Sequence, residues 1–126
     1  MSPFQKQLHQ GPVEHPYDQE ILARMLVEIS MADGNLAGEE EAFLTQFIPP
    51  QIGSVQDLSR RPRLSPQELS ACSQGAVRTT MQTLAWVLAL ADDEFEKAEE
   101  ERLFAFGIGL QLSQAHKQWS RELAQR

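Results

Sequence analysis

The chain has 126 residues, a length typical of one domain with a single hydrophobic core. Its formal net charge of −7 argues against nucleic-acid binding, which needs a basic surface. A single cysteine, Cys72, cannot form an internal disulfide, and the longest apolar run has eight residues, too few to span a bilayer. We therefore expect a soluble, cytoplasmic protein of bacterial type without a leader segment.

In chain order, residues 1–16 predict a short helical turn after Ser2 and then an extended lead-in. A long helix is predicted from Tyr17-Asp18 up to Gly34, because apolar residues recur along it at helical spacing: Ile21, Leu22, Met25, Leu26 and Ile29. A second helix is predicted over about 38–47, with Phe43, Leu44 and Phe47 facing inward, and Pro49-Pro50 end it.

Residues 49–64 have no sustained periodicity and are predicted to form a linker. The linker contains Arg60, Arg61 and Arg63. Short charge clusters of this kind are most often solvated loops, and the alternative is a site for an anion or for a partner's acidic surface.

The second half of the chain begins with a clear helix start at Ser65-Pro66-Gln67-Glu68. It supplies an N-cap serine, a proline at the first helical position and a glutamate for a capping box. A break is predicted at Ser73-Gln74-Gly75, and from Val77 the pattern becomes apolar nearly all round, which is typical of a central helix. Further helices are predicted over 98–110 and after Ser113. Gly107 and Gly109 allow close packing of the helix over 98–110, and the alternative for Gly109 is fraying of the helix end. No segment alternates like a strand.

Two stretches of the chain match after a shift of 59 residues. The shift carries Asp33 to Asp92 and Leu44 to Leu103, and the apolar residues upstream follow it. This match indicates an internal duplication. We therefore predict an all-α, single-domain bundle of about five to seven helices, built from two duplicated helical hairpins related by a pseudo-twofold axis. After the lead-in 1–16, the domain 17–126 divides into repeat one (about 18–48), the linker 49–64, repeat two (about 77–110) and a C-terminal helix (113–125).

Acidic residues concentrate in two turns, which hold eleven of the 18 Asp and Glu residues within 33–41 and 92–101. A hard divalent cation such as Ca²⁺, Mg²⁺ or Mn²⁺ takes several oxygen ligands, and carboxylates this close repel one another without a cation. No organic cofactor is indicated. The metal-ligand candidates are Asp33, Glu40, Asp92 and Glu99, with Glu41, Asp93 and Glu100 as outer candidates.

Helix capping explains the same glutamates without a metal. With Ala37 and Glu96 as N-caps, Glu40 and Glu99 fall at the third helical position, where a glutamate closes a capping box. The residues alone leave both explanations open. An EF-hand is excluded, because the twelfth position counted from either aspartate is a leucine and not the required glutamate.

The sequence Ala32-Asp33-Gly34, then five residues, then Glu40-Glu41, within a duplicated hairpin, resembles the TerB-like tellurite-resistance domain family. Such domains also occur at the front of a membrane-anchored DnaJ-like co-chaperone. The resemblance covers about residues 18–110. It implies two related helical halves, a metal ion bound by the acidic residues, and a role in tellurite and other stress responses. The second copy departs from the motif because Asp93 replaces the glycine, and His15-Pro16-Tyr17-Asp18 departs from the co-chaperone's His-Pro-Asp signature by its inserted tyrosine.

No catalytic arrangement is indicated, because His9, His15 and His116 have no cysteine or serine at a suggestive spacing. Cys72 is predicted to be buried and Trp86 to be a packing residue. We rank first a non-catalytic, TerB-like metal-binding stress module that acts through protein partners. A structural protein-interaction domain, with the acidic turns as helix caps and docking surface, comes second, and a metal-dependent hydrolase is a distant third. Neither nucleic acid nor membrane insertion is expected, and a homodimer is compatible with the sequence.

Overall fold

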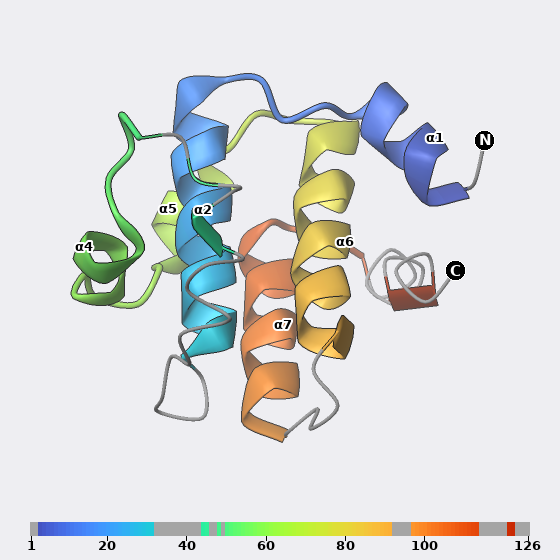
Figure 1. The fold of residues 1–126 in the computed structure, drawn as a ribbon. Coiled ribbons are helices and arrows are strands. Elements are labelled where there is room, and N and C mark those ends of the chain that lie inside the picture. Colours follow the sequence, from blue (N-terminus) through green and yellow to red (C-terminus); the bar gives the residue numbers. More distant parts are fainter. Residues whose placement is uncertain are drawn as a thin grey trace.

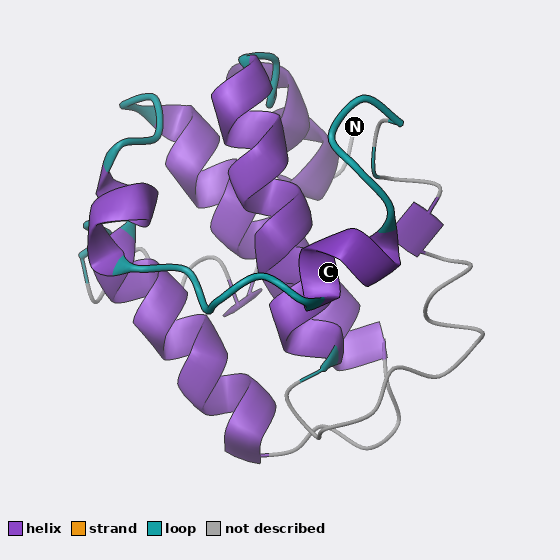
Figure 2. Ribbon diagram, turned by 90° about the vertical axis from the view of Figure 1, so that its left-hand side faces the viewer, coloured by secondary structure: helices purple, strands orange, loops and turns teal. Residues whose placement is uncertain are grey.

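The computed structural model describes residues 3–31, 44–45, 48, 50–91, 97–113 and 121–122. Within these residues the structure has no strand, as Figures 1 and 2 show, and the all-α prediction is confirmed. None of the described helices combines the length and the apolar character needed to cross a membrane. The helices are α1 (Pro3–Gln10), α2 (Pro16–Ser30), α4 (Val55–Ser59), α5 (Pro66–Ser70), α6 (Ala76–Ala91) and α7 (Lys97–Gly109).

Helices α2, α6 and α7 pack against one another and form the centre of the bundle. Figure 1 shows α2 and α6 running in the same direction and α7 running back between them. The main core lies where the three meet, and its fully buried side chains include Ile21, Met25, Met81, Leu103 and Phe106. Trp86 is 1% exposed, which confirms the prediction that it packs in the core.

Local capping explains where α2 begins. His15 is its N-cap, and the Nδ1 atom of His15 accepts a hydrogen bond from the backbone N–H of Tyr17 at 3.2 Å. Pro16 occupies the first turn, where its missing N–H costs nothing. The helix ends at Ser30, with Met31 as its C-cap, so it stops before Gly34, which lies outside the described residues.

The segment 49–64, predicted to be a linker without sustained periodicity, contains a short helix, α4. Ser54 and Asp57 form a reciprocal capping box at its start. Val55 and Leu58 are buried in a second core cluster together with Ala23, Leu26, Val27, Leu44 and Ile48. α4 therefore covers a face of α2 that the main core leaves open.

The start of α5 and the break after it are confirmed. Ser65 and Glu68 form the predicted capping box, and α5 ends at Ser70. The chain turns through Gly75, whose φ of +97° favours glycine, before α6 begins. Arg78 is 4% exposed and holds this turn together by hydrogen bonds to surrounding carbonyl groups.

The lead-in packs onto α6 through a buried glutamine. Gln7 donates from Nε2 to the carbonyl of Ala76 at 3.1 Å and to Oγ1 of Thr80 at 2.9 Å. The predicted helical turn after Ser2 is thus confirmed as α1, and its contacts are with the start of α6.

At the far end of α7, Gly109 lies against Leu69 of α5, which favours close packing over the alternative of fraying at this glycine. A Cβ atom at position 109 would lie 2.3 Å from Cδ1 of Leu69. The predicted C-terminal helix 113–125 lies mostly outside the described residues. Arg121 and Glu122 are helical there, and the Arg121 guanidinium lies 5.2 Å from the ring centroid of Trp86.

The helix bounds bear on the proposed repeat. Adding 59 to the bounds of α2 gives 75–89, and α6 spans 76–91. Leu44 and Leu103, which the shift relates, are both fully buried. Met25 and its counterpart Leu84 differ, because Met25 is fully buried and Leu84 only half-buried. Subtracting 59 from the bounds of α7 gives 38–50 as the corresponding helix of the first copy. In that range Leu44 and Thr45 are the residues described as helical.

Candidate functional site

Most of the predicted metal ligands lie outside the described residues, namely Asp33, Glu40, Glu41, Asp92 and Asp93. Glu99 and Glu100 are described, and both lie in the first turn of α7. Among the residues that the structure describes, no group of three or more His, Cys, Asp or Glu side chains could hold a metal ion.

Glu99 is buried, with 5% of its surface exposed. A buried carboxylate is costly unless a cation or hydrogen-bond donors compensate for its lost hydration. Because α7 begins at Lys97, Glu99 is its third residue, the position that a capping-box glutamate occupies. Its burial is therefore compatible with a cation site and with a cap.

Three helix ends meet at one end of the bundle. Figure 1 shows α2 and α6 both finishing at the bottom of the view, where α7 begins. In sequence, Asp33 follows Met31 by two residues and Asp92 follows Ala91 directly. The C-terminal ends of helices carry partial negative charge, so two of them side by side favour a cation nearby.

A second feature is a pocket of about 150 Å³ between α2, the end of α4, the linker and α7. Its charged lining consists of four arginines and one glutamate: Arg24, Arg61, Arg63, Arg102 and Glu28. We call it the arginine pocket. Arg61 and Arg63 come from the linker, so two members of the linker cluster lie at a pocket and not on a featureless loop.

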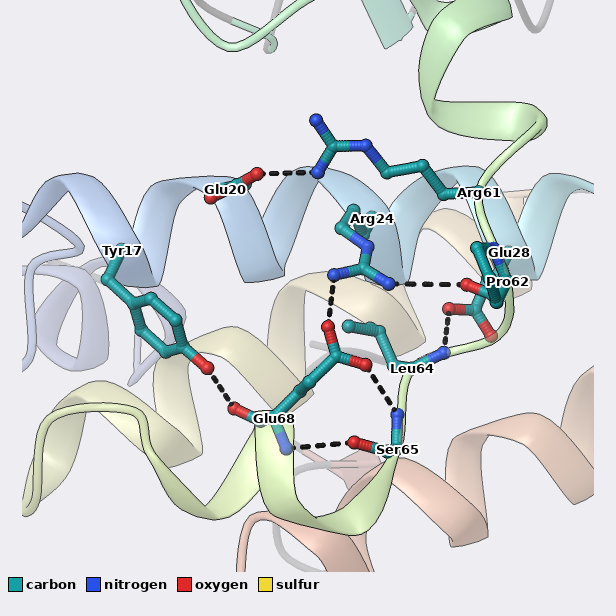
Figure 3. Close-up of polar contacts among 9 residues, drawn as sticks. All are labelled: Tyr17, Glu20, Arg24, Glu28, Arg61, Pro62, Leu64, Ser65 and Glu68. Carbon is teal, nitrogen blue, oxygen red and sulfur yellow. Dashed lines mark hydrogen bonds and ion pairs between the residues drawn. The ribbon is translucent and has the colours of Figure 1, made fainter.

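Ion pairs place two of these arginines (Figure 3). Arg24 donates from Nη1 to Glu68 and from Nη2 to the carbonyl of Pro62 at 3.2 Å. Arg61 donates from Nη1 to Glu20 at 2.6 Å, across the surface of α2. These bonds hold the linker against α2.

Glu28 forms part of the pocket wall and also holds two elements together. Its Oε2 accepts from the backbone N–H of Leu64 at 2.8 Å, and its Oε1 accepts from Nη2 of Arg102 at 2.6 Å. The Arg102 guanidinium lies 5.0 Å from the ring centroid of Phe106. The Nε atom of Arg102 is buried, and the described part of the chain offers it no hydrogen-bond partner.

Sequence reasoning identified Arg61 and Arg63 but missed Arg24 and Arg102. Arg24 lies among apolar residues of α2, and Arg102 follows the acidic first turn of α7. No local pattern relates either to the linker, because the three segments are brought together only by helix packing.

The described cysteine and histidines do not line the arginine pocket. Cys72 is 3% exposed, which confirms the prediction of burial. The pKa of its thiol is raised to about 11, first by burial and then by the neighbouring Asp18 carboxylate. His9 lies in α1, His15 caps α2, and His116 is outside the described residues.

Comparisons of the chain with protein-family models, with curated proteins and with solved structures found no match.

Proposed function

We propose that this protein is a non-catalytic, metal-binding module of the TerB-like, stress-response type that acts in the cytoplasm through protein partners. A divalent cation, Ca²⁺, Mg²⁺ or Mn²⁺, binds at the end of the bundle where α2 and α6 finish. Its ligands come from Asp33, Glu40, Asp92 and Glu99, with Glu41, Asp93 and Glu100 around them. Two related helical hairpins contribute one half of the site each.

The arrangement of the helix ends is the observation that supports this proposal. α2 and α6 pack against each other and end on the same side, and α7 starts there with the buried Glu99. The ends of α2 and α6 and the start of α7 therefore lie on one side of the bundle. The helix C-termini and the clustered carboxylates together favour a bound cation. The link to tellurite and other stress responses rests on the motif resemblance.

Thermal unfolding in metal-depleted buffer, followed by addition of each ion, tests the proposal. A ligand that binds only the native state at a hundredfold excess over Kd stabilises it by about 2.7 kcal/mol. For a domain of this length we expect the melting temperature to rise by roughly 10 °C. The Asp33→Asn/Asp92→Asn variant should lose this rise.

A charge-matched control separates a site from general electrostatics. Glu14 and Glu122 are exposed, so the Glu14→Gln/Glu122→Gln variant also removes two negative charges but should keep the full response to metal. An absence of stabilisation by every ion, or an equal loss in the control variant, would refute the metal site.

A second candidate is a structural interaction domain in which the glutamates are caps. The position of Glu99 as the third residue of α7 favours it, because Asp57 and Glu68 close capping boxes at that same position in α4 and α5. Glu99→Gln distinguishes the two functions, since glutamine also closes a capping box but is a poorer cation ligand. If Glu99 is only a cap, the variant keeps its stability and no ion stabilises either protein. If Glu99 binds metal, the variant loses most of the stabilisation by the ion.

A further inference from the structure

We propose that the arginine pocket binds a small, doubly charged oxyanion of the phosphate or sulfate class. The site shares no residue with the proposed cation site, so neither proposal depends on the other. Its walls come from α2, α4, the linker and α7, which makes it a property of the folded chain and not of the linker sequence alone.

Charge is the first argument. The protein as a whole carries a net charge of −7, yet the charged residues that line this pocket are four arginines and one glutamate, Glu28. Glu68 and Glu20 pair with Arg24 and Arg61 from outside the lining. Arg63 is exposed and has no ion pair within the described residues, so the pocket keeps an excess positive charge.

Unused hydrogen-bond donors are the second argument. A guanidinium group has five N–H donors in a planar fork that matches oxyanions. Arg61 uses one of them on Glu20, and Arg102 uses one on Glu28. The Nε–H of Arg102 is buried, with no acceptor in the described part of the chain, which is unusual for a native protein. Within the described residues the other Nη–H groups of Arg61 and Arg102 have no acceptor, so they can donate to an oxyanion.

Pre-organisation is the third argument, and Figure 3 shows the contacts that hold Arg24. The side chain of Arg24 is 9% exposed and is fixed by Glu68 and the Pro62 carbonyl. The guanidinium of Arg102 is fixed by Glu28 and lies over Phe106. Cationic groups that are already held in place lose little conformational freedom when an anion binds.

The size of the pocket selects the ligand. About 150 Å³ is below the range of roughly 300–1,000 Å³ that is typical of pockets for drug-sized molecules. The pocket volume therefore fits an ion of a few heavy atoms. A tetrahedral oxyanion can accept hydrogen bonds from several guanidinium groups at once.

Calorimetric titration of the full chain with inorganic phosphate tests the proposal. The titration is run near pH 7 in metal-depleted buffer, with the ionic strength held constant by NaCl so that general screening does not change. We expect saturable binding to one site and competition by sulfate at the same ionic strength. Absence of saturable binding would overturn the proposal.

Arg63→Gln and Arg60→Gln form a matched pair of variants. Both arginines are exposed linker residues, but only Arg63 lines the pocket. We expect Arg63→Gln to weaken phosphate binding by about tenfold and Arg60→Gln by less than about twofold. Equal weakening in the two variants would mean that phosphate responds only to net charge, which contradicts a defined pocket.

A variant of Arg102 tests whether the geometry of its guanidinium group matters for anion binding. Arg102→Lys keeps the charge but removes the planar fork and the buried Nε–H, so it should weaken binding several-fold while circular dichroism stays unchanged. Wild-type affinity in this variant would refute the role of Arg102.

Free phosphoserine distinguishes a free ion from a phosphoryl group carried on another molecule. Tighter binding than that of inorganic phosphate indicates a phosphoryl group on another molecule, and weaker binding indicates the free ion. Phosphate binding should persist in Asp33→Asn/Asp92→Asn, which separates this test from that of the metal site.

Discussion

Arg24 and Glu68 join α2 to the first turn of α5 through one shared carboxylate. Glu68 accepts from Arg24 with Oε2 and from the backbone N–H of Ser65 with Oε1, at 3.0 Å, where it closes the capping box. The bond from Ser65 lowers the pKa of Glu68, and the Arg24 guanidinium lowers it further. The same carboxylate thus starts a helix and holds the linker that brings Arg61 and Arg63 to the pocket.

Glu68→Gln and Glu68→Ala should differ in stability. Glutamine keeps the capping bond and loses the ion pair, which is worth about 0.2–1 kcal/mol because Glu68 is 37% exposed and solvent screens the pair. Alanine also removes the cap, so we expect a total loss of about 1–2.5 kcal/mol. Urea unfolding measures both, with the exposed Glu14→Gln as a control expected to stay near wild type. Equal losses in the two Glu68 variants would show that the charge contributes nothing.

The lowered pKa of Glu68 also predicts an acid dependence. The pKa of Glu68 in the folded protein lies below its ordinary value of 4.5. Such a carboxyl contributes its full stability above pH 4.5 and loses that contribution as the pH falls through the folded-state pKa. The unfolding free energy of wild type minus that of Glu68→Gln should therefore shrink as the pH falls below about 4.5. Urea unfolding at a series of pH values measures this difference. A difference that stays constant would contradict the assigned shift.

Arg78 should be among the most sensitive positions in the chain. It is 4% exposed, and all five of its N–H donors are used, on the oxygens of Ser70, Cys72, Ser73, Leu110 and Gln111. Arg78→Met leaves several carbonyls without donors and should cost at least about 3 kcal/mol. Arg78→Lys should recover only part of this loss, because an ammonium group has three donors and no planar fork. Full recovery by lysine, measured by urea unfolding, would show that charge and not geometry matters here.

Gly109→Ala should destabilise the protein even though alanine is the better helix former. The new Cβ atom would lie 2.3 Å from Cδ1, 3.1 Å from Cγ and 2.8 Å from Cβ of Leu69. Relieving these overlaps requires α5 and α7 to separate, which we expect to cost about 1–3 kcal/mol. In a Leu69→Ala background, which removes two of the three overlaps, Gly109→Ala should cost less. Additive effects in this double-mutant cycle would rule out the contact as the cause.

Cys72 should react slowly with thiol reagents in the native protein. With a pKa of about 11, its thiolate fraction at pH 8 is on the order of two hundredfold below that of a free cysteine. Its burial slows access further. Labelling with an aromatic disulfide reagent should be slow in buffer and fast in urea. Rapid labelling of the native protein would contradict both the burial and the raised pKa.

Much of the helix framework could be predicted because its signals are local. Ser65 and Glu68 start α5, Gly75 separates α5 from α6, and the apolar spacing of α2 follows from the contacts that a helix needs on one face. The capping box of Ser54 and Asp57 in α4 is equally local. The helix α4 has too few residues for a period to show, which is why the linker pattern did not indicate it.

The sequence by itself determined the all-α class, the places where the main helices begin and the burial of Cys72 and Trp86, since these depend on residues within a few positions of one another. Only the tertiary structure decided that Arg24, Arg63 and Arg102 line one pocket and that Gly109 lies against Leu69. These neighbours are far apart in the chain. They come together through the crossing of α2 and α7 and through the docking of the linker, which depend on side-chain packing across the whole core.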